Sequence, residues 1–572
     1  MLSDTGRAAD LLFRKLEGID EHVVKRHPLL CHYYALALFE IGDYPQALRW
    51  HELDYASGVD FARSDYALLR LSYIAAMCRD TERTAQFFFL QYDIRDRPWQ
   101  NVGQRIWSVL GEQIVSDSIY HDTRRIGIFF LSSTEALGHA ILDPYHFLAL
   151  NRDRFDKIYF IGPSRDTYRA ASAVCIEILE QFGEYIEVED DLMLNLSWMN
   201  LGEQTIRIDE LVPPHDFARV ASNVAAGLQL FGKKEFGGLH DVELSLVVKN
   251  YWGLLREVYL RHGDRSDEFQ HNSWCLTLPN HIDLLGRSIC ERENIDLAKP
   301  LVVLHLREPQ YHQLTKQSFR DTKPHDYIPA IRHLLARGFQ VVRIGDRSNQ
   351  RLPIRQPGYF EAPFLKCYSP ELDPFLISRA AFMVGCQSGP CAYARAFGVP
   401  LLSVNAVLHY TLFPSSLEMA CFKRYVRVAS PQDRTKDADE ISIAQALEQN
   451  FFHMENTFQF RRAGIRVVAC TSDEIVAAVD DMLNWLAHRN HPPTAEQAEF
   501  ARLVKAVCER LRTETAVSVP LADYLGIDLP GYRIAPTVAT ARRDPPIEIS
   551  AEAQISDGAE TTPPGNVAQS AA

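Results

Sequence analysis

The chain has 572 residues, which is too long for one hydrophobic core, so we expect about three domains. With 47% hydrophobic and 23% charged residues, its composition is that of a folded globular protein. A formal net charge of −14 argues against a nucleic-acid partner, because phosphate backbones require a basic face.

The amino-terminal sequence shows no basic region followed by an apolar one, so we expect no signal peptide. No apolar run approaches the roughly 20 residues that cross a bilayer, so we expect no transmembrane segment. The 11 cysteines include no CxxC pair, which favours reduced thiols over a metal site. These features together predict a cytoplasmic protein.

Residues 1–120 show helical periodicity throughout, and we predict an all-α region there. One segment resembles the centre of a tetratricopeptide repeat (TPR). Its matching positions are Ala35, Leu38, Gly42, Tyr44, Ala47 and Leu48. A weaker helix pair follows at residues 64–91. Since an array needs at least three repeats, we expect a short TPR-like cap that either holds a partner or stabilises its neighbour.

Residues 121–295 alternate between apolar strands and helices. Strands are predicted at 125–131, 157–161 and 185–188, with helices between them. This order is typical of a Rossmann-like domain with a parallel sheet and right-handed crossovers. Residues 241–261 are expected to form one long helix.

Residues 296–515 predict a second Rossmann-like domain, and residues 535–572 a disordered tail poor in large apolar side chains. The expected strands are 301–304, 339–344, 381–385 and 401–404, with a possible last strand at 465–469. The fold class is therefore α/β, with two Rossmann-like domains facing a cleft behind an all-α region.

Two loops of the second domain follow predicted strands, at the sheet edge where ligands of such folds gather. In the later loop, Ser388 can cap the next helix and Pro390 can occupy its first turn. Gly389 would let a ligand approach, and free backbone N–H groups would bind an anion. The alternative is a well-capped helix without a ligand.

The earlier loop, after residue 304, is long and rich in charged side chains. Arg307 suits bidentate binding of a diphosphate, or it is a surface arginine in an ion pair. Other candidate ligand-binding or catalytic residues here and on the next strand are His305, Glu308, Arg320, Asp321, Arg343 and Asp346. The alternatives are a structural histidine and solvated loop charges.

Gly138 and His139 open the first predicted helix of the first domain, and Asp143 lies one turn later. This pair would bring an imidazole and backbone donors to the cleft between the sheets. A histidine at a helix start is often structural, so both interpretations stay open.

The two-lobed plan resembles the GT-B glycosyltransferase architecture. The segments 303–307 and 388–401 resemble a bacterial glycosyltransferase family whose members also have a Gly-His loop like Gly138-His139. The pair His305 and Arg307 is similar to the strand end of GDP-sugar fucosyltransferases, which implies that Arg307 binds the diphosphate and assists its departure. The resemblance also implies no metal and no cofactor.

We therefore expect an enzyme that moves a sugar from a nucleotide diphosphate-sugar to a protein or glycan acceptor, which the amino-terminal helices would help to hold. Arg307 would stabilise the departing diphosphate. His139, Glu308 and Asp321 are the candidates for the base. Two alternatives remain, a sugar-nucleotide epimerase of the same fold and a non-enzymatic TPR scaffold.

Overall fold

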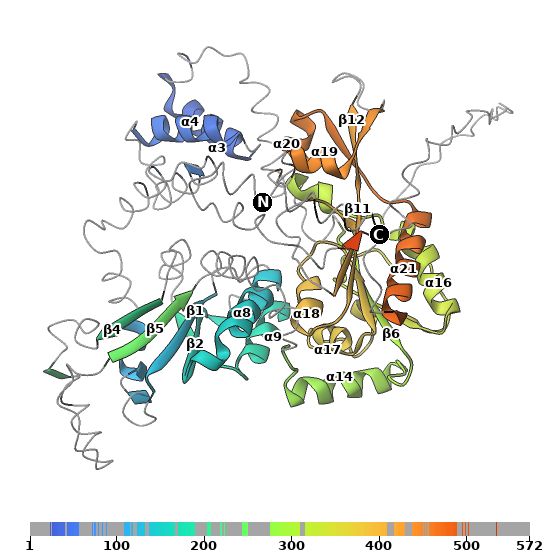
Figure 1. Cartoon of the computed structure of the whole chain (residues 1–572), viewed down its shortest axis with the longest axis horizontal. Helices are drawn as coiled ribbons and strands as arrows, with labels where there is room; N and C mark the ends of the chain where they lie inside the picture. The colour runs from blue at the N-terminus through green and yellow to red at the C-terminus, as the bar shows by residue number, and fades with distance from the viewer. Residues whose placement is uncertain are drawn as a thin grey trace, which may run out of the picture.

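The computed structural model describes thirteen longer segments and some isolated positions between them (Figure 1). The segments are residues 26–40, 43–56, 108–114, 123–131, 137–165, 170–188, 203–207, 243–249, 275–308, 315–408, 417–428, 437–449 and 457–488. Within them, no helix has both the length and the apolar character needed to cross a membrane. The predicted tail at 535–572 lies outside the described residues.

The amino-terminal region contains a helical hairpin of α3 (Pro28–Glu40) and α4 (Tyr44–Ala56). Small and apolar side chains at helical spacing let the two helices pack closely, and Ala35, Leu38 and Ala47 are almost fully buried between them. The chain reverses at Asp43, whose N–H donates to the Leu38 carbonyl over 3.0 Å. Gly42 and most of the second predicted helix pair lie outside the described residues, so the TPR assignment stays a prediction.

The first sheet has the strand order β3-β2-β1-β5-β4. Strands β1 (Arg125–Phe130), β2 (Lys157–Pro163) and β3 (Glu184–Val188) are parallel, as the alternation of strands and helices predicts. Helices α8 (Leu137–Asn151) and α9 (Ala170–Leu179) provide the crossovers, and their apolar side chains pack on Phe129, Ile158 and Phe160.

The helix expected over residues 241–261 is wrong at its start. Glu243–Lys249 is strand β5, which pairs in parallel with β1 and antiparallel with β4 (Glu203–Arg207). The strand ends in the β-branched pair Val247-Val248, which favours extended backbone. Pairing on both sides therefore decides the conformation of a segment whose pattern alone was ambiguous.

The second sheet is entirely parallel and has the order β15-β11-β10-β9-β6-β7-β8. Its strands are β6 (Leu301–His305), β7 (Gln340–Ile344), β8 (Tyr359–Glu361), β9 (Phe382–Gly385), β10 (Leu401–Ala406), β11 (Glu418–Phe422) and β15 (Arg533–Ile534). The central strands are buried on both faces, which explains their continuous apolar sequences.

Helices cover both faces of this sheet (Figure 1). On one face, α16 (Ile328–Ala336) and α21 (Ser472–Ala487) pack on Val302, Leu304 and Val341. On the other, the apolar core is shared with α14 (Asn280–Arg292), α17 (Leu372–Arg379) and α18 (Cys391–Ala396). That second core continues into α8 and α9, so the two sheets are joined by a continuous apolar contact.

A third, antiparallel sheet lies beyond the second one and has the order β13-β12-β14. Its strands are β12 (Arg424–Val428), β13 (Asp437–Ile441) and β14 (Ile465–Val468), with α19 (Ile443–Glu448) and α20 (Thr457–Arg462) beside them. Arg462 at the end of α20 forms an ion pair of 2.9 Å with Asp43, which links this sheet to the amino-terminal hairpin.

Candidate functional site

The carboxyl ends of β6 and β9 bring the two predicted loops together, because these strands are parallel neighbours. His305 Nδ1 and Ser388 Oγ are 2.8 Å apart. The backbone N–H of Arg307 donates to Cys386 Sγ over 3.0 Å. The adjacent polar ends of two buried strands thus hold both loops in contact.

A compact group of charged side chains lies beside these loops. We call Arg307, Arg320, Lys423 and Asp321 the basic cluster. Arg307 Nε is 3.2 Å from Asp321 Oδ1, and all three cationic side chains act electrostatically on that carboxylate. Arg320 Nε donates to the Gln387 carbonyl over 3.1 Å. Within the described part of the chain, the cluster therefore has three cationic groups around one carboxylate.

The start of α18 differs from our expectation of free amides. The N–H of Cys391 donates to the Ser388 carbonyl over 3.2 Å, and that of Ala392 to the Gly389 carbonyl over 3.0 Å. Pro390 is the residue before the helix, and Ser388 makes no side-chain cap because its hydroxyl faces His305. These amides are engaged within the turn, so the positive groups at this edge come mainly from side chains.

The amino end of α8 meets the amino end of α18, at a contact we call the interlobe joint. A Cβ atom on Gly389 would lie 3.0 Å from the Gly138 nitrogen and 3.1 Å from Leu137 Cβ. Near it, Cys175 Sγ of α9 is 3.1 Å from the hydroxyl of Tyr393 on α18, and both groups are buried. Both glycines permit a close approach of two backbones, which was not the reason we expected for Gly389.

The interlobe joint places His139 next to the basic cluster, since the Arg320 guanidinium acts electrostatically on its imidazole. His139 Nδ1 is 3.1 Å from Asp143 Oδ2 one turn along α8. Burial lowers the pKa of His139, but the Asp143 carboxylate outweighs this and holds that pKa above the ordinary value. The Asp143 carboxylate is therefore placed to orient the imidazole.

Alanine at Gly389 is expected to destabilise the interlobe joint, while alanine at Gly138 is not. The new methyl group at Gly389 meets backbone and a Cβ atom at about 3 Å, so we expect a loss of about 1–3 kcal/mol. The matched methyl at Gly138 lies 3.4 Å from Gly389 Cα, an ordinary contact, and removing a helical glycine favours α8 by about 0.5–1 kcal/mol. Thermal unfolding of both variants measures the difference, and equal melting temperatures would contradict this joint.

Two other predicted site residues belong to a separate buried ion-pair network. The Arg343 guanidinium contacts the Glu308 carboxylate, and the two side chains are only 3% and 1% exposed. Arg343 Nη1 is also 2.8 Å from Glu361 Oε1 and donates to the Gln350 carbonyl over 2.8 Å. Burial raises the pKa of Glu308 despite the nearby arginine. Glu308 and Arg343 therefore bind each other and their neighbours at the edge of the second sheet.

Asp346 is exposed after β7, where its Oδ1 accepts the N–H of Ser348 over 2.8 Å. On the same edge, the amino end of α17 has buried oxygens without a hydrogen-bond partner among the described residues: Ser369 Oγ, Glu371 Oε2 and Asp373 Oδ1. Burial raises the pKa of Asp373 to about 8. Oxygens of this kind accept hydrogen bonds from ligand hydroxyl groups.

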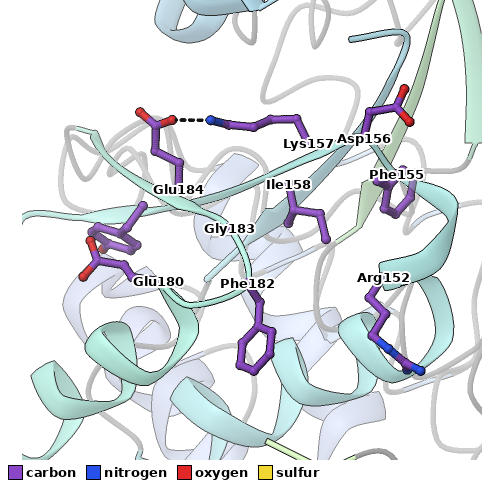
Figure 2. A pocket seen from close by; sticks show the side chains of 10 residues that line it. Arg152, Phe155, Asp156, Lys157, Ile158, Glu180, Phe182, Gly183 and Glu184 are labelled. Carbon is purple, nitrogen blue, oxygen red and sulfur yellow. Dashed lines mark ion pairs between the residues drawn. The ribbon is translucent and has the colours of Figure 1, made fainter. Parts of the chain in front are cut away.

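A pocket of about 550 Å³ lies elsewhere, at the amino edge of the first sheet (Figure 2). Lys157 and Glu184 face one another across it and form an ion pair of 2.8 Å, while Asp156 pairs with Arg125. Phe155 and Phe182 also line it. Because it is at the opposite strand ends from the basic cluster, this pocket is separate from the predicted site.

Sequence reasoning missed Lys423 and Asp373. Lys423 follows the buried strand β11 and is itself only 4% exposed, but Arg424 comes directly after it, so the sequence gave no sign that this lysine is buried. Asp373 lies in the first turn of α17, where an acidic residue ordinarily improves helix stability, so its sequence context gave no separate indication.

No protein-family model and no curated protein matches the chain. Among solved structures, it is similar to a glycosyl transferase of family 9 from Veillonella parvula, with 10% identity, a TM-score of 0.34, and coverage of 63% of this chain and 97% of that one. It is similar to the E. coli ADP-heptose LPS heptosyltransferase II at 13% identity and a TM-score of 0.30, covering 58% and 98%. The heptosyltransferase TibC in complex with ADP-D-β-D-heptose shows 12% identity and a TM-score of 0.27, covering 64% and 77%.

The comparison corrects our expectation that neither a metal nor another cofactor is needed. TibC, from enterotoxigenic E. coli, is a dodecameric iron-containing glycosyltransferase. In the described segments, no group of three or more His, Cys, Asp and Glu side chains is placed to hold a metal ion. The described residues thus offer no ligand set for iron, and the expected lack of a cofactor is withdrawn.

Proposed function

We propose that the chain is a GT-B type glycosyltransferase that moves a sugar from a nucleoside diphosphate-sugar to a protein or glycan acceptor. The observation that supports this most is the basic cluster at the carboxyl edge of a fully parallel sheet. Ligands of open α/β sheets bind at that edge. A diphosphate is the anion that best matches several buried cationic groups in one place.

The cluster suits the charge that develops during transfer. When the bond between sugar and diphosphate breaks, negative charge accumulates on the departing phosphate oxygens. Arg307 and Arg320 are buried and already fixed, by Asp321 and the Gln387 carbonyl respectively. Positive groups that need no rearrangement stabilise a transition state more than mobile ones do. We assign Arg307 the largest share because it ends a central strand.

Of the three candidate bases, we propose His139. Glu308 is in a buried ion pair with Arg343, and Asp321 is in an ion pair with Arg307. Each carboxylate is therefore already held by an arginine. The His139 side chain keeps 35% of its surface exposed, and Asp143 orients it. An imidazole of this kind accepts a proton from an acceptor hydroxyl group near neutral pH.

The remaining proposed contacts serve binding. His305 and Ser388 lie beside Arg307, and Gly138, Gly389 and Pro390 form the wall at the interlobe joint. Asp346 and the oxygens at the start of α17 would accept hydroxyl groups of the nucleoside. We assign the amino-terminal hairpin to the acceptor, because it reaches the third sheet through Asp43 and Arg462.

Titration calorimetry with ADP, UDP, GDP and CMP tests the proposal. We expect one of the diphosphates to bind in the micromolar range, about −8 kcal/mol, and CMP to bind far more weakly because it lacks a second phosphate. The matching nucleotide-sugar should slowly release free nucleoside diphosphate, whereas an epimerase would change the sugar and keep the bond. A chain that binds none of the four is a scaffold, not a transferase.

A further inference from the structure

Lys423 connects two parts of the chain that lie far apart in sequence. It stands between β11 and β12, and its backbone N–H donates to the Ala406 carbonyl over 2.8 Å. Its ammonium group donates to the carbonyls of Phe319, over 3.0 Å, and Asp321, over 2.5 Å. With 4% of its surface exposed, the side chain is enclosed where these elements meet.

The segment that Lys423 holds contains two members of the basic cluster. Residues Thr315–Arg320 form a short 3-10 helix, and Asp321 follows it directly. Among the segment's other backbone attachments, the Phe319 N–H donates to Thr457 Oγ1 over 3.1 Å and the Thr322 N–H donates to the Arg307 carbonyl over 2.9 Å. The Lys423 contacts lie between these two points, beside Arg320.

We infer that Lys423 is a positioning residue for the nucleotide site: its ammonium group fixes the backbone of Phe319–Asp321 so that Arg320 and the Arg307–Asp321 pair face the diphosphate. This inference rests on the proposed function. Lys423 acts through main-chain carbonyls, and it is distinct from the groups that would touch the phosphates. Charged donors bind carbonyls about twice as strongly as neutral ones do, so the protonation state of Lys423 sets the strength of this attachment.

Its protonation changes in an accessible range. Burial lowers the pKa of Lys423 to about 8. The groups that face it are Asp321 on the held segment, Arg307 after β6, Cys386 after β9 and Cys470 before α21. Above pH 8 the folded chain loses this proton while the unfolded chain keeps it to about 10.4, so this group favours folding as the pH rises. The titration of Lys423 therefore does not itself unfold the chain over that range.

The affinity of the wild-type chain should fall with rising pH. With the tightest binder among ADP, UDP and GDP, we expect about a fivefold loss between pH 7.5 and pH 9.0, because the form with a neutral lysine still binds, about tenfold more weakly. Lys423→Met should bind about tenfold more weakly at pH 7.5 and show no such pH step. Lys423→Arg, which keeps its charge, should recover part of the affinity and also lack the step. Lys299→Met, at a lysine 62% exposed, should behave as the wild type.

Hydrogen exchange of the amides of residues 319–322, without nucleotide, separates this inference from the proposed function. We expect these amides to exchange faster in Lys423→Met than in wild type. In wild type, their exchange should also increase more with pH than that of amides elsewhere in the chain. The Lys299→Met control should match the wild type in both respects. Unchanged exchange in Lys423→Met, or a pH-independent affinity in wild type, overturns the positioning role. If Lys423→Met exchanges faster but the folded wild type binds no nucleotide, the proposed function and the nucleotide role of Lys423 are both overturned. Only the local attachment of residues 319–321 by Lys423 then remains.

Discussion

Replacing Arg307 by alanine is expected to lower the affinity for the nucleoside diphosphate by about 10- to 100-fold. The guanidinium is 7% exposed and held by Asp321, so it makes charge-assisted hydrogen bonds with little loss of side-chain freedom. Bonds of this type contribute about 1.5–3 kcal/mol, and each 1.4 kcal/mol corresponds to a factor of ten. Titration calorimetry of both chains at pH 7.5 measures the change.

Arg287→Ala is the matched control, because this arginine is 51% exposed and pairs with Asp283 on α14, away from the site. It should leave the affinity unchanged. Arg307→Lys should recover little, since an ammonium group lacks the planar fork of a guanidinium. An Arg307→Ala chain that stays folded and binds as tightly as wild type would remove the basis of the proposed site.

Replacing Glu308 by alanine is expected to destabilise the chain instead of only inactivating it. The variant leaves the Arg343 guanidinium buried with Glu361 as its remaining carboxylate partner. Breaking a buried ion pair from one side costs about 3–5 kcal/mol, and we expect the lower end because Glu361 stays. For a unit of 150–250 residues this is about 6–12 °C in melting temperature, measured by calorimetry.

Glu291→Ala is the control for Glu308, because that glutamate is exposed on α14 and its removal should change stability by under about 0.5 kcal/mol. Glu308→Gln should fall between the two, since it keeps hydrogen bonds and loses the charge. A Glu308→Ala chain with a wild-type melting temperature that no longer transfers sugar would show that Glu308 acts in the chemistry and that the network does not depend on it.

The fold was predictable wherever the apolar pattern was unambiguous. Continuous apolar runs such as Leu301–Leu304 are strands because both of their faces are covered. The segment Glu243–Lys249 was not predictable, since its pattern suits a helix or a strand and only pairing with β1 and β4 decides between them. Local sequence does not encode such long-range pairing.

The sequence predicted where the site residues lie, but not which side chains they contact. Parallel strand ends share an edge, so the strand assignment placed Arg307 and the loop at Ser388 on the same edge, while their contact depends on β6 and β9 being neighbours. Whether an arginine can bind a ligand depends on the strand register, which sets its neighbours. Arg343 lies directly opposite Glu361 in the pairing of β7 with β8. Register and long-range contacts, such as that of Lys423 with Asp321, are set by tertiary packing.

The interlobe joint determines what kind of movement the two lobes allow. Sliding of α8 and α9 along α18 would separate Cys175 from Tyr393 and force side chains into the space beside Gly389. Rocking about the two glycines would also disturb the apolar core that α8 and α9 share with α17 and α18, so the joint resists both movements. Any movement of one sheet against the other must therefore break packed apolar contacts as well as polar ones, and the cost of separating buried surfaces opposes it.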